Sequence, residues 1–250
     1  SPGRQSGQPV RRLSHAHDGL RPHGPQRPLH ASADPAATVR FKSPNACNIC
    51  HQDKDATWAD QQVRQWHERD YQKPVLEQAA LVDAARRGDW SRLDAILEYI
   101  GSKDRDEVVA ASLIRLLRNC GSQAKWPAMI KAIREDASPL VRGAAAQTLD
   151  GHPATESLHA LAQATGDEYR LVRVRAAAGL AAVPVEQIAN EHQAAVKRAT
   201  AELLDALSTH PDDYASQYNL ANFHSQRGEQ DKALASYENA IKLRADFVPP

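Results

Sequence analysis

Residues 138–149 (SPLVRGAAAQTL) and residues 169–180 (YRLVRVRAAAGL) align with each other and decide the fold of this chain. They lie roughly 31 residues apart, and both contain the pattern Val-Arg-x-x-Ala-Ala-x-x-Leu. A repeat of this length is typical of helical hairpins stacked on one another, because a single hairpin cannot bury its apolar face alone. The sequence therefore predicts an all-α protein built around an α-solenoid.

The repeated pattern resembles that of HEAT repeats, in which small Ala side chains let stacked helices approach closely while Val and Leu fill the layer between them. A weaker copy begins near Asp106, with apolar positions at Val108, Val109, Ala111 and Leu116. Further upstream, helical periodicity predicts one helix over residues 75–85, a turn at 87–89 and a partner helix over 90–99. We therefore expect HEAT-like hairpins over residues 74–186.

The last part of the chain carries a second kind of repeat. It resembles a tetratricopeptide repeat, and the positions that fit are Leu220, Ala221, Gly228, Ala233, Tyr237 and Ala240. Two positions depart from the pattern, since Gln217 stands where Trp is usual and Ala245 where Pro is usual. We expect a truncated tetratricopeptide-like repeat over residues 187–250 that docks on the HEAT-like stack, with residues 191–207 as a helix of a preceding unit.

The pentapeptide Cys47-Asn48-Ile49-Cys50-His51 is a CxxCH motif. In this arrangement two thiols add across the vinyl groups of a haem, and the imidazole after the second Cys ligates the iron. Two intervening residues let one turn of backbone present both sulfurs to one porphyrin edge. The motif predicts a covalently bound haem c, with Cys47 and Cys50 as thioether anchors and His51 as the proximal iron ligand.

Other interpretations of the cysteines remain open. Cys47, Cys50, His51 and His67 would be a ligand set for zinc, although no second CxxC or closely spaced His pair completes such a site. An exposed Cys pair without function is the third alternative. Cys120, at an expected helix end, is predicted to be a small buried thiol.

Residues 41–59 read FKSPNACNICHQDKDATWA. This stretch resembles the last haem motif of the bacterial multihaem c-type cytochromes that carry HEAT-like and tetratricopeptide repeats, and the resemblance covers about residues 35–250. It implies one-electron transfer in the periplasm, with redox proteins or other haem subunits as partners. We expect a haem c attachment segment over residues 41–73, whose helix covers one side of the haem with Trp58, Val63 and Trp66 on one face.

An iron that transfers electrons normally takes a sixth ligand, most often His or Met. His67 is the candidate nearest in sequence, while His15, His17 and His30 lie in the N-terminal arm and a partner protein is a further source. Met129, the one Met of the chain, lies at helical spacing that predicts core packing instead. The repeat arginines Arg142, Arg173 and Arg175 are expected to be solvated or to form salt bridges between repeats.

Residues 1–40 are rich in Pro, Gly, Arg and His and predict a disordered arm. A second hypothesis is that residues 10–34 are an out-of-frame reading of another haem motif. They can be back-translated so that reading one nucleotide later gives a peptide that begins CAGCHMPM. The underlying nucleotide sequence decides between these two hypotheses.

Composition narrows the function classes. The 250-residue chain has zero formal net charge and 5% aromatic residues, so nothing indicates a nucleic-acid partner. No apolar run approaches the ~18 residues of a membrane span, and no hydrolase or nucleotide-binding motif is present. The sequence thus favours an electron-transfer protein over an enzyme, with a protein partner on the solenoid. The alternatives are a helical-repeat scaffold without redox activity and a fragment of a multihaem reductase.

Overall fold

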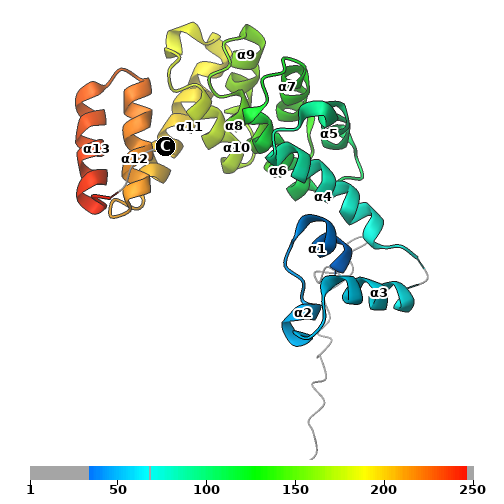
Figure 1. Cartoon of the computed structure of the whole chain (residues 1–250). Coiled ribbons are helices and arrows are strands. Elements are labelled where there is room, and N and C mark those ends of the chain that lie inside the picture. The colour runs from blue at the N-terminus through cyan, green and yellow to red at the C-terminus, as the bar shows by residue number, and fades with distance from the viewer. Residues whose placement is uncertain (1–33, 68, 247–250) are drawn as a thin grey trace, which may run out of the picture.

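A computed structural model describes residues 34–67 and 69–246. This part of the chain contains thirteen α-helices, three short 3-10 helices and no strand. The helices follow one another along an arc, from α1 to α3 at one end to α12 and α13 at the other (Figure 1). The prediction of an all-α protein with an α-solenoid is confirmed.

Three helical hairpins form the centre of the arc. They are α5 (Leu93–Gly101) with α6 (Glu107–Leu116), α7 (Lys125–Glu135) with α8 (Pro139–Leu149), and α9 (Thr155–Ala164) with α10 (Arg170–Gly179). The second helices α6, α8 and α10 pack on one another as an inner layer on the concave side of the arc, and α5, α7 and α9 lie outside them (Figure 1).

The remaining elements extend the stack in both directions. Before it lie α1 (Pro35–Phe41), α2 (Cys47–Cys50), α3 (Ala56–Trp66), α4 (Gln72–Arg86) and the 3-10 helix η1 (Trp90–Arg92). Within and after it lie η2 (Leu117–Asn119), η3 (Val185–Gln187), α11 (Asn190–Ser208), α12 (Tyr214–Gln226) and α13 (Gln230–Leu243). The helices predicted over residues 75–85 and 191–207 correspond to α4 and α11, which are somewhat longer.

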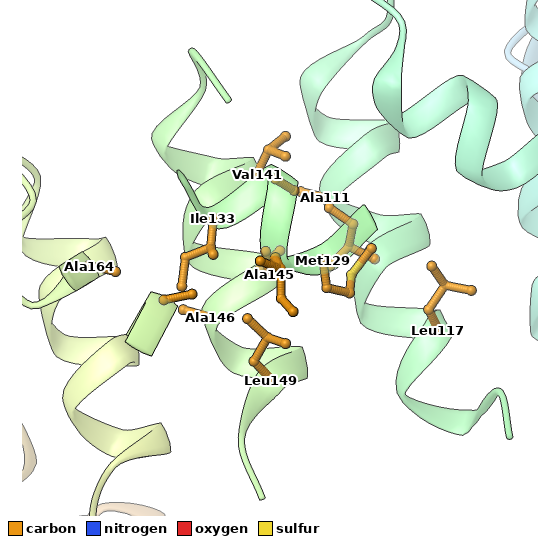
Figure 2. Packing of buried hydrophobic residues seen from close by; sticks show 14 of the residues in the cluster. Ala111, Leu117, Met129, Ile133, Val141, Ala145, Ala146, Leu149 and Ala164 are labelled. Carbon is orange, nitrogen blue, oxygen red and sulfur yellow. The ribbon is translucent and has the colours of Figure 1, made fainter. Parts of the chain in front are cut away.

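Small side chains let the hairpins approach closely. Ala144, Ala145 and Ala146 of α8 are fully buried, and one continuous core joins α4 through α11. Figure 2 shows Met129 beside Ala145 in this core. Met129 is 0% exposed, so its predicted role in packing is confirmed. Cys120 is likewise a buried free thiol, as predicted.

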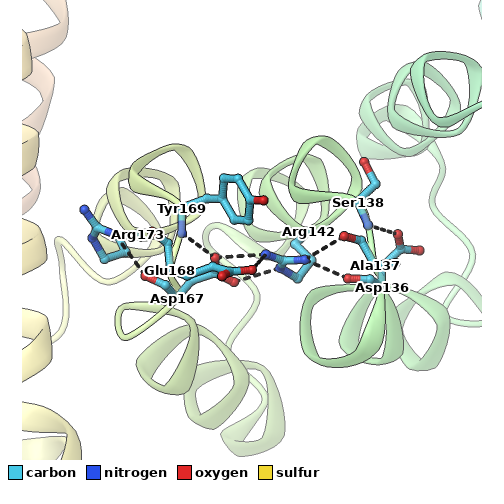
Figure 3. Close-up of polar contacts among 8 residues, drawn as sticks. All are labelled: Asp136, Ala137, Ser138, Arg142, Asp167, Glu168, Tyr169 and Arg173. Carbon is cyan, nitrogen blue, oxygen red and sulfur yellow. Dashed lines mark hydrogen bonds and ion pairs between the residues drawn. The ribbon is translucent and has the colours of Figure 1, made fainter. Parts of the chain in front are cut away.

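A buried arginine links successive hairpins. Arg142 of α8 donates two hydrogen bonds to the Asp167 carboxylate, 2.7 Å from Nε and 3.0 Å from Nη2. Its Nη1 also donates to the carbonyls of Asp136 (2.8 Å) and Ala137 (3.2 Å), in the loop that precedes its own helix (Figure 3). One side chain thus makes hydrogen bonds both within its own hairpin and to the next hairpin.

The same arrangement recurs one repeat later. Arg173 donates to the carbonyls of Asp167 (3.0 Å) and Glu168 (2.9 Å), and its guanidinium pairs with Glu202 of α11. The first hairpin has Ala111 at the equivalent position, and the Asp136 carboxylate is paired with Arg105 instead. Salt bridges between repeats are therefore confirmed for Arg142 and Arg173.

The α12–α13 hairpin closes the far end. Gly228, at the predicted turn, has φ +73°, a conformation that L side chains rarely adopt. Next to it the Glu229 carboxylate accepts from Arg227, His224 and Lys232, and these hydrogen bonds lower the pKa of Glu229 to about 2. The element is the antiparallel hairpin expected here. Its assignment as a tetratricopeptide repeat stays a prediction.

The disordered arm predicted over residues 1–40 is wrong in its last part, because α1 begins at Pro35. Proline suits the first turn of a helix, where its missing N–H is not needed. Ala36 and Ala37 are buried, since α1 packs on α3 and α4. Gln72 joins all three helices: its Oε1 accepts from Ala36 N (3.0 Å) and its Nε2 donates to Asp60 (2.8 Å). The rest of the arm, including the segment of the shifted-frame hypothesis up to residue 33, lies outside the described residues.

Candidate haem-attachment site

The CxxCH motif forms a single helical turn, α2. His51 N donates to the carbonyl of Cys47 at 2.9 Å, so that His51 ends the turn directly after Cys50. Residues three apart lie on the same side of a helix, and the two thiols therefore share one side of this turn. Both are free, Cys47 partly exposed and Cys50 exposed. The structure thus brings the three predicted site residues together in one short element.

Two asparagines hold the backbone of this turn. Asn45 Oδ1 accepts from Cys47 N (2.9 Å), and Asn45 Nδ2 donates to Asn48 Oδ1 (2.8 Å). Asn48 Nδ2 in turn donates to the carbonyl of Lys54 at 2.7 Å, across the loop that follows the motif. Sequence reasoning missed this role, although an Asn two residues before the motif's first Cys is a typical signal of an Asx turn.

Helix α3 places an aromatic ring beside the imidazole. Asp55 begins the helix by accepting from Trp58 N at 2.7 Å, which fixes the first turn. The Trp58 ring then lies 5.0 Å from the His51 ring, tilted by 54°. Within the described residues the His51 ring and the two thiols make no hydrogen bond. Their lone pairs are therefore available to a ligand.

The motif lies at the surface of the protein. None of the side chains of α2 is buried, and Ile49, between the two cysteines, is 72% exposed. An apolar hollow of about 520 Å³ lies nearby, between the stretch that precedes the motif and helices α4 and α6. Phe41, Pro44 and Val75 are among its lining residues, whereas no residue of the motif lines it.

These observations fit a haem that is attached to side chains on the surface of the protein. Attachment requires two reactive thiols on one side of a turn and a neighbouring imidazole, all accessible to the maturation apparatus. Here the backbone of the turn is fixed by hydrogen bonds, while Cys50 and His51 are exposed and Cys47 is partly exposed. The donor set present is the one that covalent haem attachment requires.

The face predicted for α3 is wrong in part. Val63 is buried together with Ala59, one helical turn before it, whereas Trp66 is 70% exposed. The reason is that α3 packs on α1 through residues spaced four apart, and this stripe does not include Trp66. Trp58 remains next to the motif through its contact with His51.

The structure does not bring His67 to His51. His67 lies just after the last residue of α3, where its ring packs edge-on against Tyr71 at 4.6 Å. His51 contacts Trp58 in the first turn of the same helix, nine residues earlier, which corresponds to ~14 Å along a helix axis. His67 thus lies at the end of α3 opposite to the one that contacts His51, and its role as a sixth ligand stays a prediction.

The zinc site and the remaining candidates for the sixth iron ligand can also be compared with the structure. Among the described residues, no three His, Cys, Asp or Glu side chains form a group able to hold a metal ion, so Cys47, Cys50, His51 and His67 do not converge on a zinc site. The core position of Met129 removes it as an iron ligand. His15, His17 and His30 lie outside the described residues.

Comparison with known proteins supports the repeat architecture. The family of HEAT repeats matches residues 93–181, which span α5 to α10 and the residues just after them. No curated protein and no solved structure matches the chain. A search of the described helices found none whose length and apolar character would let it cross a membrane. The central part of the chain is thus a stack of helical hairpins that is similar to HEAT repeats.

Proposed function

We propose that this protein is a helical-repeat scaffold that carries a covalently attached haem c and takes part in one-electron transfer. The HEAT match over residues 93–181 supports the scaffold part. A single observation carries the haem part: α2 presents Cys47, Cys50 and His51 on one surface turn, with the backbone fixed and the thiols and imidazole left unbonded within the described chain.

Each residue has a distinct role in this proposal. Cys47 and Cys50 form the thioether bonds, and His51 provides the proximal nitrogen. The iron, when bound, supplies a reversible one-electron couple whose potential depends on its axial ligands. Asn45 and Asn48 fix the turn, and Trp58 limits rotation of the imidazole.

The cellular setting is part of the same proposal. Haem of this type is attached outside the bacterial cytoplasm, so we propose a periplasmic location, with redox proteins or other haem subunits as electron donors and acceptors. Since His67 is held at the far end of α3, we propose that the sixth ligand comes from the N-terminal histidines or from a partner.

Expression together with the c-type maturation apparatus tests the haem. The intact mass of the full chain should rise by one haem, the colour should survive acid-acetone extraction, and reduction should give a sharp α band. The variants Cys47→Ala and Cys50→Ala should lose most of the covalent haem. Cys120→Ala is the matched control, since that thiol is buried in the solenoid, and it should retain the haem.

One second function is favoured by an independent observation. The HEAT match covers α5 to α10 and does not include the CxxCH turn, as expected of an interaction scaffold without redox activity. If the full chain acquires no haem under conditions that mature a control cytochrome, the redox proposal is wrong and the scaffold alone remains.

A further inference from the structure

Arg175 differs from the two arginines that link the hairpins. Arg142 and Arg173 donate to carboxylates and to carbonyls of the preceding loop. Arg175, two residues after Arg173, has no ion pair or hydrogen bond within the described residues, and its Nη1 is buried without a partner. Of the two roles expected for the repeat arginines, Arg175 therefore does not form the salt bridge between repeats.

The position of Arg175 explains this difference. It shares one face of α10 with Leu171, whereas Val172 and Ala176 on the other side are fully buried. The Arg175 side chain extends across Gly143 of α8, where an added Cβ would lie only 3.1 Å from Nη1 and 3.3 Å from Cδ. Gly143 thus leaves the room that the arginine occupies on the inner layer.

A second arginine adds positive charge at the same place. Burial lowers the pKa of Arg175, and the nearby charge of Arg115 on α6 lowers it further. No carboxylate contributes to this shift, and Arg115 itself is exposed. Helices α6 and α10 both pack on α8, the middle helix of the inner layer, so Arg115 and Arg175 come from its two neighbours, and neither has a counter-ion in the described chain.

An anion would stabilise such an arrangement. A buried donor without an acceptor loses its hydration, and a neighbouring like charge increases the cost. Guanidinium groups bind carboxylates through paired hydrogen bonds, and such charged contacts are stronger than neutral ones. Exposed apolar side chains, Leu171 on α10 and Val108 on α6, belong to the same layer.

We propose that Arg115 and Arg175 bind a carboxylate side chain of an acidic, partly apolar segment of a partner protein, on the inner face of the HEAT repeats. Charge complementarity identifies the acidic group, and Leu171 and Val108 favour a protein segment over a small anion. The inference rests on the scaffold part of the proposed function and does not depend on the haem.

Binding of a defined peptide tests the proposal with the full chain. The probe is a fluorescein-labelled peptide of alternating Glu and Leu, compared with the same peptide carrying Lys for Glu, and the readout is fluorescence anisotropy. Arg175→Met and Arg115→Met should each weaken binding of the Glu peptide roughly tenfold, the loss expected for one charged hydrogen-bonding group. Arg134→Met, on the outer helix α7, is the matched control and should bind like the unaltered protein.

Thermal stability separates binding from folding. Because Arg175 is partly buried and unpaired, Arg175→Met should leave the Tm unchanged or raise it. A lower Tm together with weaker binding would show that Arg175 is structural and would overturn the proposal. It is also overturned if Arg134→Met loses as much affinity, if the Lys peptide binds equally well, or if the unaltered protein does not bind.

Two further measurements fix the kind of ligand and the role of the haem. Inorganic phosphate that displaces the peptide at the peptide's own concentration range would indicate a site for small anions and contradict a protein segment. Cys47→Ala, which cannot form both thioethers, should bind the Glu peptide with unchanged affinity. Failure of haem attachment and failure of the docking site are then separate results.

Discussion

The HEAT-like hairpins (α5 to α10) and the CxxCH turn (α2) differ in whether their polar side chains have hydrogen-bond partners within the protein. In the hairpins, Arg142 is satisfied by the carboxylate of the next repeat and the carbonyls of its own loop. In α2 the backbone is just as well fixed, by Asn45 and Asn48, but the thiols and the imidazole have no hydrogen-bond partner in the described chain. Apart from Arg175, the arginines that link the hairpins thus find their acceptors within the stack, whereas the side chains of the CxxCH turn are left free to react or bind.

The largest effect should come from breaking the inter-repeat link. Arg142→Met removes the guanidinium that pairs with the Asp167 carboxylate, and the two side chains are only 10% and 12% exposed. We expect a loss of about 3 kcal/mol in the free energy of unfolding, because removal of one member strands a buried charge. Thermal denaturation should show a Tm lower by roughly 6–12 °C.

A neighbouring pair at the surface provides the control for that prediction. Arg170 pairs with Asp205 at 3.1 Å, but the two side chains are 53% and 79% exposed. Arg170→Met should therefore cost no more than about 0.5 kcal/mol. Equal losses in the two variants would mean that burial does not distinguish these pairs.

The next largest loss of stability is expected at Gln72, where the segment around the CxxCH turn meets helix α4. Gln72→Ala leaves Ala36 N and one Asp60 oxygen without a partner in a buried place, which costs about 1–3 kcal/mol locally. Hydrogen exchange should accelerate in α1 and α3 while α8 keeps its protection. Gln65→Ala, at an exposed position of α3, serves as the control. Uniform acceleration through α8 would contradict the separation of the two regions.

Acid should lower the stability of the hairpins by protonating Asp167. Burial alone would raise the pKa of Asp167, but hydrogen bonds from Arg142 and Tyr169 N and the charges of Arg142 and Arg173 outweigh it, so the pKa is lowered. Stability from this group is present above its ordinary value of 3.8 and is lost as pH falls through the lower folded value. Urea titrations between about pH 5 and about pH 2 should show a smaller loss of stability for Asp167→Asn than for the unaltered protein.

The smallest effect is expected at the motif itself. Without haem, Cys50→Ser should change the free energy of unfolding by less than about 0.5 kcal/mol, because the thiol is exposed. Cys120→Ser places a hydroxyl in the core and should cost about 1–3 kcal/mol. Chemical denaturation of both variants checks the contrast. A large loss in Cys50→Ser would show that the turn contributes to the fold after all.

Local patterns predicted the repeats well but not the directions of individual side chains. The period of the Val-Arg pattern located α8 and α10 and placed Met129 in the core. Arg173 and Arg175 look alike in sequence, yet they lie on different faces of α10, and only the stacking of α8 against α10 reveals which one is paired.

The same limit applies to the residues near the motif. His67 is close to His51 in sequence, but the rigid length of α3 separates them. Closeness in sequence to His51 is therefore a poor predictor of which residue could be the sixth iron ligand. The composition of the arm also obscured α1, whose helix depends on packing against α3 and α4 as well as on its own residues.

Helix α4 belongs to both regions, since it packs on α1 on one side and on α6 on the other. It therefore acts as a rigid spacer that sets the angle at which the CxxCH turn is held against the stack. One inserted residue would turn the attached segment by about 100° and move it ~1.5 Å along the helix axis. Four inserted residues would bring it back to nearly the original direction, ~6 Å farther away. The length of this one helix thus sets both the direction and the distance at which the CxxCH turn is held from the stack.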